Sequence, residues 1–200
     1  LKLQPSAWDE RVANVTPESH ATLIYTSGTT GEPKGGVLSH GNFVSNVTTC
    51  STFFDVNAGT VGLSFLPLAH VFERMIDYVF FSRAATITYA ESIEKLADNF
   101  GEVKPHCFAS VPRVYDKIHA KIFQNLEDQP PARQKIFRWA VEVGKERLAL
   151  LEKRRPVPGG LALKYRVADR LVFSKIKARL GGRFRFCLSG GAPLSKEVAE

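Results

Sequence analysis

Residues 25–36 carry the side chains and the backbone freedom that binding a polyanion requires. The stretch reads YTSGTTGEPKGG, in which hydroxyls and glycines lead up to Pro33 and Lys34. Glycine lets backbone N–H groups turn toward one point and lets a ligand come close. Hydroxyls donate hydrogen bonds, and lysine adds one mobile positive charge. We interpret the stretch as a loop that surrounds the phosphates of a nucleotide. The alternative, a flexible linker rich in Gly, Ser and Thr, explains neither the preceding strand nor the lysine.

Two widespread phosphate-binding patterns do not fit this loop. A Walker A loop has Gly-Lys followed by Ser or Thr, whereas Lys34 lies between Pro33 and Gly35. The dinucleotide pattern of three spaced glycines is also missing. If the stretch binds phosphates, its pattern is a different one.

Strands and helices alternate along the chain and must position this loop. The short apolar run 21–25 predicts a buried strand directly before it, and residues 1–20, with Pro5 and Pro17, read as a connector. Further strands are predicted at 61–66, 84–89, 107–111 and 184–188, and helices at 39–55, 69–82, 93–103, 112–126, 132–154 and 161–180. Strands separated by helices of this length indicate an α/β fold, with a largely parallel sheet flanked by helices on both faces.

Ligands of such sheets bind at the carboxyl ends of the strands. The segments after Tyr25, Leu66, Val111 and Leu188 all follow predicted strands, so we expect them at one edge of the sheet. Three of them carry motifs of their own. These motifs are LPLAHVFER at 66–74 with His70, SVPRVYDKI at 110–118 with Arg113, and SGGAPLS at 189–195.

The four motifs together resemble one family. Residues 25–34 fit the phosphate loop of the adenylate-forming enzymes at every position. The chain is similar to the AMP-binding superfamily of acyl-CoA synthetases, firefly luciferase and peptide-synthetase adenylation domains, from about residue 20 to 200. The motifs at 66–74 and 110–118 look most like those of long-chain acyl-CoA synthetases. One departure is Gly36, where the family usually has a β-branched or apolar residue, and we expect it to loosen the turn after the loop.

The resemblance implies ATP, Mg²⁺ and coenzyme A as ligands and assigns a role to several residues. Thr26 also contacts magnesium in this interpretation, and His70 lines the site without acting as a catalytic residue. The expected phosphate-binding residues are Thr26, Ser27, Gly28, Thr29, Thr30, Gly31 and Lys34, and the expected adenine-facing residues are Gly190, Gly191, Ala192 and Pro193.

The implied reaction converts a fatty acid, ATP and coenzyme A into acyl-CoA, AMP and pyrophosphate. We expect 21–200 to be part of the N-terminal domain of such a ligase, because the family's magnesium carboxylate, ribose aspartate and C-terminal lysine have no counterpart here. On that interpretation the isolated piece is inactive. An aryl- or amino-acid-adenylating relative and a non-catalytic module that binds nucleotide or membrane remain as alternatives.

Charge is concentrated in one part of the chain. Residues 131–185 hold 16 basic and four acidic residues, within a protein of net charge +7. The helical part of this block, 131–182, predicts contact with an anionic membrane surface or with the phosphates of coenzyme A. No nucleic-acid motif accompanies it. We expect a cytoplasmic protein in peripheral contact with the inner membrane face, and its three cysteines to be small buried residues.

Overall fold

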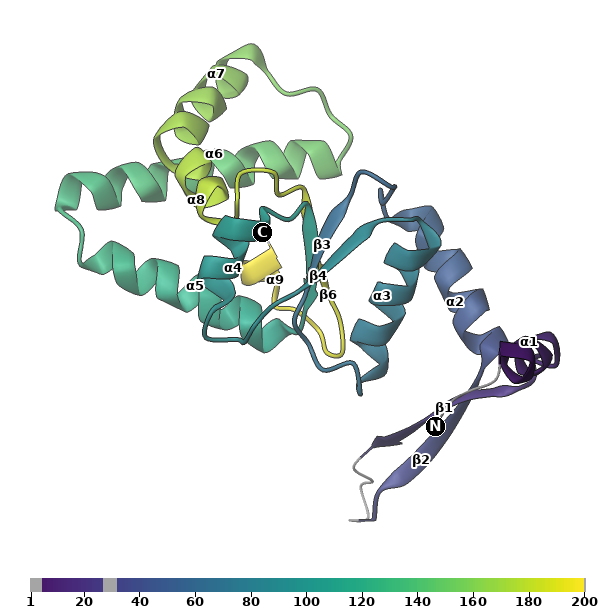
Figure 1. Ribbon diagram of the computed structural model, residues 1–200. Coiled ribbons are helices and arrows are strands. Elements are labelled where there is room, and N and C mark those ends of the chain that lie inside the picture. Colours follow the sequence, from purple (N-terminus) through teal and green to yellow (C-terminus); the bar gives the residue numbers. More distant parts are fainter. Residues whose placement is uncertain (1–4, 27–31, 200) are drawn as a thin grey trace. The chain divides into compact units, whose positions relative to one another are not determined.

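The computed structural model describes residues 5–26 and 32–199, which divide into two compact units (Figure 1). The first unit comprises Leu1–Gly59 and Pro67–Thr86, and the second comprises Thr60–Leu66 and Ile87–Glu200. Each unit is built around its own sheet.

The first unit contains helix α1 (Pro5–Ala13), strands β1 (His20–Thr26) and β2 (Lys34–Ser39), and helices α2 (His40–Phe53) and α3 (Val71–Ser82). β1 and β2 form an antiparallel hairpin (Figure 1). The prediction of a buried strand in a parallel sheet is therefore wrong for 21–25, because β1 pairs only with β2 among the described strands and its residues are exposed or half-buried. Helix α1 lies within residues 1–20, where the sequence has no helical period.

Helix α2 begins directly after the hairpin, and its start is held by a capping box. The Asn42 amide donates to Ser39 Oγ over 3.2 Å, and the Ser39 amide donates to Asn42 Oδ1 over 2.9 Å. The Gly41 amide also donates to the carbonyl of Pro17 over 2.7 Å. These bonds confirm Ser39 as the predicted cap and join the hairpin rigidly to the helix.

The second unit contains a four-stranded sheet in the order β4-β3-β5-β6. Its strands are β3 (Val61–Ser64), β4 (Thr86–Tyr89), β5 (Cys107–Ser110) and β6 (Phe186–Ser189). β3, β5 and β6 run parallel, with Phe108 paired to Leu63 on one side and to Cys187 on the other. The predicted α/β class with a largely parallel sheet flanked by helices is confirmed.

One face of this sheet is covered by helices α4 (Leu96–Val103), α5 (Pro112–Glu127) and α9 (Lys196–Ala199), as Figure 1 shows. Phe108 lies at the centre of their core. Its ring contacts four aromatic rings at centroid distances of 5.0 to 6.0 Å, those of Phe65, Phe100, Tyr115 and Phe184. These contacts hold β5 in place, because two of the rings belong to neighbouring loops and two belong to α4 and α5.

A helical segment forms a second core in this unit. It consists of α6 (Pro131–Glu152), α7 (Gly159–Ala168), the π-helical turn η1 (Asp169–Phe173) and α8 (Ser174–Arg179). We call it the helical segment from here on. Its core is formed by Ala140, Val143, Leu161, Ala168 and Val172. Both predicted long helices are confirmed, but the second contains the π turn, which sequence periodicity did not reveal.

The helical segment ends at two glycines with opposite tolerance for a side chain. Gly181 has φ +88°, and a Cβ there would lie 2.4 Å from Lys104 Cα and 2.7 Å from the Phe100 carbonyl oxygen. Gly182 has φ +79°, but a Cβ there would meet nothing within 4 Å.

We expect Gly181→Ala to lower the free energy of unfolding by more than about 3 kcal/mol, because backbone atoms must move apart. Gly182→Ala is the matched control and should cost only about 1–2 kcal/mol for its left-handed backbone. Urea unfolding followed by circular dichroism measures both. Equal losses for the two variants would contradict the close packing of Gly181 on α4.

The three cysteines differ in burial. Cys107 is fully buried, whereas Cys50 is half-buried and Cys187 is exposed, so the prediction of three buried thiols is correct only for Cys107. Burial raises the pKa of Cys107 to about 11, against a smaller opposing effect of Arg185.

Cys107 should therefore resist iodoacetamide at pH 8 in the folded chain, because little thiolate forms and the sulfur is covered. Peptide mass spectrometry after labelling, with and without urea, tests this. Labelling of Cys107 at the same rate in both conditions would show that β5 is not the buried strand described above.

Candidate functional site

The hairpin of the first unit brings together the two ends of the predicted phosphate loop. Thr26 is the last residue of β1 and Lys34 the first of β2, and the two are paired across the ladder. Both side chains are exposed, so the hydroxyl and the ammonium are available to a ligand. The predicted phosphate-binding residues Ser27, Gly28, Thr29, Thr30 and Gly31 lie outside the described residues.

The two glycines after Lys34 belong to strand β2. Gly35 is paired with Tyr25, and a Cβ at Gly35 would lie 3.2 Å from the Tyr25 ring, so glycine leaves room for the ring across the strand. Gly36 is paired with Ile24. The expected loosened turn at Gly36 is therefore wrong, because this residue continues the ladder.

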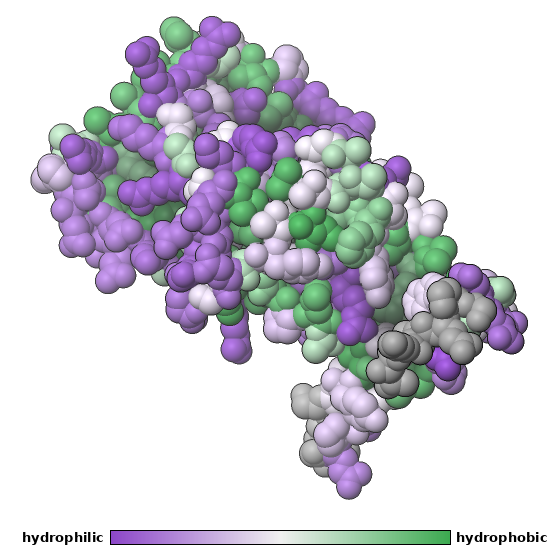
Figure 2. All heavy atoms as spheres, viewed as in Figure 1, coloured by the Kyte–Doolittle hydropathy of each residue, from purple (hydrophilic) through white to green (hydrophobic). Residues whose placement is uncertain are grey.

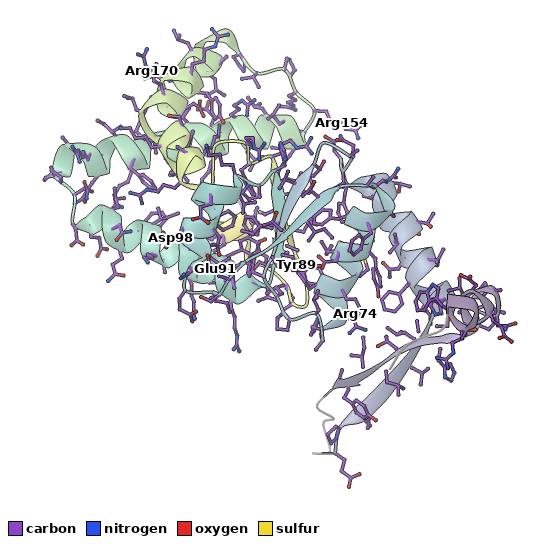
Figure 3. All side chains as sticks on the ribbon, viewed as in Figure 1. Arg74, Tyr89, Glu91, Asp98, Arg154 and Arg170 are labelled. Atoms are coloured by element: carbon purple, nitrogen blue, oxygen red, sulfur yellow. The ribbon has the colours of Figure 1, made fainter. Side chains whose placement is uncertain are left out.

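Arg74 ties strand β1 to the segment before α3. Its Nη1 donates to Thr22 Oγ1 over 2.7 Å, and its Nε donates to the Leu68 carbonyl over 2.9 Å. Figure 3 labels this arginine. Arg74 of the LPLAHVFER motif thus fixes the hairpin to the segment 66–74. The sequence pattern alone does not reveal this role.

His70 is the N-cap of α3. Its Nδ1 accepts a hydrogen bond from the Phe72 amide over 3.2 Å, and the residue is exposed. The position of the His70 side chain is therefore set by its role as the N-cap of α3. Its predicted place in the lining of the site stays a prediction.

In the second unit, the segments after β5 and β6 lie side by side. The Gly190 amide donates to the Ser110 carbonyl over 3.2 Å, and the Tyr115 hydroxyl donates to the Leu188 carbonyl over 2.7 Å. Gly191 has φ +80°, a conformation that favours glycine. SVPRVYDKI and SGGAPLS therefore meet at the carboxyl edge of the parallel sheet, as predicted.

The predicted adenine-facing residues lie on this edge. Gly190 is half-buried, and Gly191, Ala192 and Pro193 are exposed in the segment that leads to α9. Arg113 is also exposed, in the first turn of α5. A flat surface of small residues beside a strand end can accept a planar ring by close backbone approach.

Two serines at the same edge have buried hydroxyls. Ser64 ends β3 and Ser110 ends β5, and each is almost completely buried. Within the described part of the chain, neither Oγ has a hydrogen-bond partner. Buried hydroxyls without a hydrogen-bond partner are uncommon in protein interiors.

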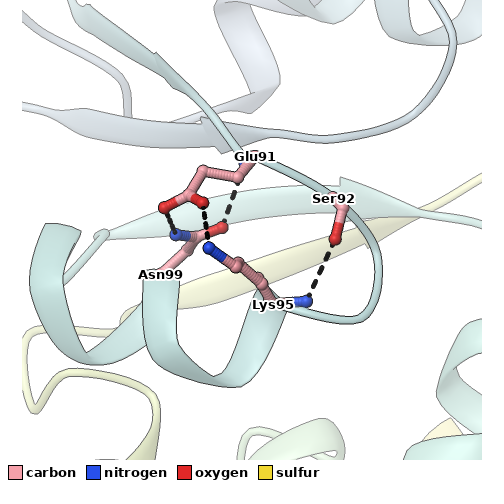
Figure 4. Close-up of polar contacts among 4 residues, drawn as sticks. All are labelled: Glu91, Ser92, Lys95 and Asn99. Carbon is pink, nitrogen blue, oxygen red and sulfur yellow. Dashed lines mark hydrogen bonds and ion pairs between the residues drawn. The ribbon is translucent and has the colours of Figure 1, made fainter.

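The segment after β4 is held by a polar network that the sequence analysis missed (Figure 4). The Glu91 amide donates to Asn99 Oδ1 over 3.1 Å, and Lys95 Nζ lies 2.6 Å from Glu91 Oε2. The hydrogen bond and charge of Lys95 lower the pKa of Glu91. The contribution of this contact to stability is present above the ordinary pKa of the carboxyl and is lost as pH falls through the lowered value.

The four predicted loops therefore fall into two groups. Those after β3, β5 and β6 follow strands of one sheet, whereas the loop after β1 belongs to the hairpin of the other unit. The prediction that all four follow strands of one parallel sheet is wrong in this respect. Among residues 5–26 and 32–199, no group of three or more His, Cys, Asp or Glu is placed to hold a metal ion.

A family model described as AMP-binding enzyme matches residues 2–200. The chain belongs to the AMP-binding enzyme family. It is 41% identical over 186 residues to the peroxisomal long chain acyl-CoA synthetase 6 of Arabidopsis thaliana, covering 92% of this chain and 25% of the relative. It is 34% identical over 190 residues to the long-chain-fatty-acid–CoA ligase 1 of Homo sapiens, covering 91% and 25%. The chain thus spans about a quarter of the length of these AMP-binding relatives.

Two solved structures share the fold. The adenylation domain of a carboxylate reductase from Mycobacterium chelonae matches with a TM-score of 0.58 and 24% identity, covering 91% of this chain and 24% of that one. ATP-bound MatB from Rhodopseudomonas palustris matches with a TM-score of 0.55 and 21% identity, covering 92% and 26%. At these identities the likeness establishes the fold alone.

We expect the Arg74 contact to be measurable as a coupling between two side chains. Arg74→Met and Thr22→Val each remove the 2.7 Å bond, so the double variant should lose less stability than the sum of the two single losses. The expected coupling is about 1 kcal/mol for a half-buried, charge-assisted bond. Urea unfolding of the four proteins gives the value, and strict additivity would show that the bond does not hold the hairpin.

Proposed function

We propose that the chain is the phosphate- and adenine-binding part of an ATP-dependent long-chain fatty acid–CoA ligase. One observation carries the proposal: the phosphate-loop sequence of this AMP-binding protein begins and ends at Thr26 and Lys34, which are paired in the hairpin. The names of the two relatives reported above, a long chain acyl-CoA synthetase and a long-chain-fatty-acid–CoA ligase, support the acyl substrate.

The first proposed step joins two anions. A fatty acid carboxylate oxygen attacks the α-phosphorus of ATP, the bond to the β-phosphate oxygen breaks, and acyl-AMP and pyrophosphate form. Catalysis of this step is positioning plus charge neutralisation, and no protein nucleophile is needed. Lys34 supplies positive charge to the β- and γ-phosphates in this proposal, and Thr26 supplies a hydroxyl beside it.

In the second proposed step the coenzyme A sulfur attacks the acyl carbon and AMP leaves as the product. Gly190, Gly191, Ala192 and Pro193 are proposed to lie against the adenine. Their support is the exposed, glycine-containing segment at the carboxyl edge of the parallel sheet, where ligands of such sheets bind. His70 keeps its proposed role as a residue that lines the substrate site.

Magnesium is proposed to arrive as the partner of ATP. A hard cation of this size takes oxygen ligands from carboxylates and phosphates. Thr26 offers one hydroxyl, and the described residues hold no cluster of three or more potential metal ligands, so they do not form a metal site by themselves.

The basic block 131–185 is proposed to contact an anionic membrane surface from the cytoplasmic side. Its net positive charge is the support. No helix in the described ranges is long and apolar enough to cross a bilayer. The proposed contact is peripheral.

We expect the chain to bind Mg-ATP, and Lys34→Ala to weaken binding at least about tenfold, because one phosphate charge contact is lost. Isothermal titration calorimetry measures the dissociation constants. Lys135→Ala, an exposed lysine on α6, is the matched control and should leave them unchanged. Equal weakening by both variants, or no binding by any, would overturn the phosphate-loop assignment.

The 200-residue chain alone should form no palmitoyl-CoA above background from palmitate, ATP and coenzyme A, because it spans about a quarter of its relatives. In a protein that also contains the remaining parts of the family, ATP–pyrophosphate exchange should depend on palmitate. Exchange that depends instead on an aryl acid or an amino acid would contradict the fatty-acid assignment.

A further inference from the structure

The helices after α6 form the most strongly basic part of the chain. Residues 153–179 contain nine basic residues and one acidic residue, Asp169. That single carboxylate is already paired, because Lys177 Nζ lies 2.7 Å from Asp169 Oδ1. Figure 3 labels Arg154 and Arg170, two of the arginines in this range. The local charge therefore attracts an anionic partner rather than a second copy of the same surface.

One side of α7 and η1 is covered by the rest of the helical segment. Leu161, Ala168 and Val172 are buried against Ala140 and Val143 of α6. This packing fixes the rotation of α7, so the residues on its opposite side face away from α6.

The opposite side carries an exposed row of aliphatic residues. Leu163 is 63% exposed, and Val167 and Leu171 are each 43% exposed. They are spaced by four residues, which places them one above the other along a helix. We call Leu163, Val167 and Leu171 the apolar stripe. Figure 2 shows hydrophobic residues among the hydrophilic ones that crowd over the helical segment.

The π turn keeps the apolar stripe straight. A π turn holds more residues than the 3.6 of an α-turn. Leu171 lies in η1 (Asp169–Phe173), so it falls more nearly in line with Val167 than it would in an unbroken α-helix. The turn that sequence periodicity missed therefore contributes to this surface.

Basic side chains flank the apolar stripe. Along α7 and η1, Lys164 falls on one side of the stripe and Arg166 and Arg170 fall on the other, and all three residues are exposed. A helix with an aliphatic row between lysines and arginines lies in the plane of a lipid surface, with its aliphatic side chains below the headgroups and its cations beside them.

We propose that the α7–η1 surface, formed by the apolar stripe and its flanking cations, docks onto an anionic lipid bilayer. This inference rests on the membrane contact proposed above and identifies the residues that make it. A nucleic acid would use the cations but not the three aliphatic residues, because bases stack on aromatic rings and the stripe has none. The stripe and its charge together therefore favour a lipid surface.

Flotation of the chain with phosphatidylcholine vesicles, with and without phosphatidylglycerol, tests the proposal. We expect binding to the anionic vesicles only, weakening as salt is raised. Leu163→Gln/Val167→Gln/Leu171→Gln should lower the partition coefficient at least about tenfold. Lys164→Glu/Arg170→Glu should lower it about 30-fold or more.

Two control variants change similar residues elsewhere in the same unit. Ile93→Gln removes an aliphatic side chain that is 62% exposed, and Lys117→Glu/Lys121→Glu makes the same change of charge on α5. Each should change the partition coefficient by less than about threefold, if the α7–η1 surface is the contact. Circular dichroism of every variant should match the parent chain.

Several results would overturn the proposal. They are absence of vesicle binding, stripe variants that bind as the parent does, and controls that lose as much as the test variants. Retardation of DNA that needs the cations but not the stripe, without vesicle binding, would assign the surface to nucleic acid. Calorimetry with ATP on the same samples separates the proposed ATP site from the proposed lipid-binding surface. The stripe variants should bind ATP as the parent chain does, whether or not they bind vesicles.

Discussion

The antiparallel ladder between β1 and β2 is the constraint on which the proposed phosphate loop depends. A loop that surrounds phosphates must begin and end at a fixed separation, and the pairing of Thr26 with Lys34 provides this. Gly35 admits the Tyr25 ring across the strand, and the Arg74 guanidinium holds β1 from the side. The capping box at Ser39 then joins the ladder to α2. The residues that support the loop, such as Ser39 and Arg74, thus lie outside the loop sequence itself.

In the second unit, a parallel sheet fixes the positions of the segments that follow its strands. Its strands are only four residues long, and the aromatic contacts of Phe108 fix β5, which lies between β3 and β6. Parallel strands bring the segments after β5 and β6 to one edge, where the Gly190 amide bonds the Ser110 carbonyl. The glycine-rich segment and the start of α5 therefore have a defined geometry before any ligand binds, which lowers the entropic cost of binding.

Sequence periodicity predicted the helices after α1 and the parallel strands of this fold because their apolar residues recur at regular spacing. It failed where local patterns carry no period. Lys34, Gly35 and Gly36 have no strand signal of their own, and β2 exists because β1 supplies its partner. The π turn at Asp169–Phe173 places Val172 in the core shared with α6, and no local pattern encodes the turn. The roles of Arg74 and Asn99 depend on partners eight to 52 residues away.

The central claim is that the hairpin of this AMP-binding chain holds the phosphates of ATP. Hydrogen–deuterium exchange with and without Mg-ATP tests it most directly, because it reports each segment separately. The account predicts slower exchange on adding ATP in peptides that cover residues 23–36, and no change in α6 or α7. Unchanged exchange at 23–36, or protection confined to the basic helical segment, would contradict it.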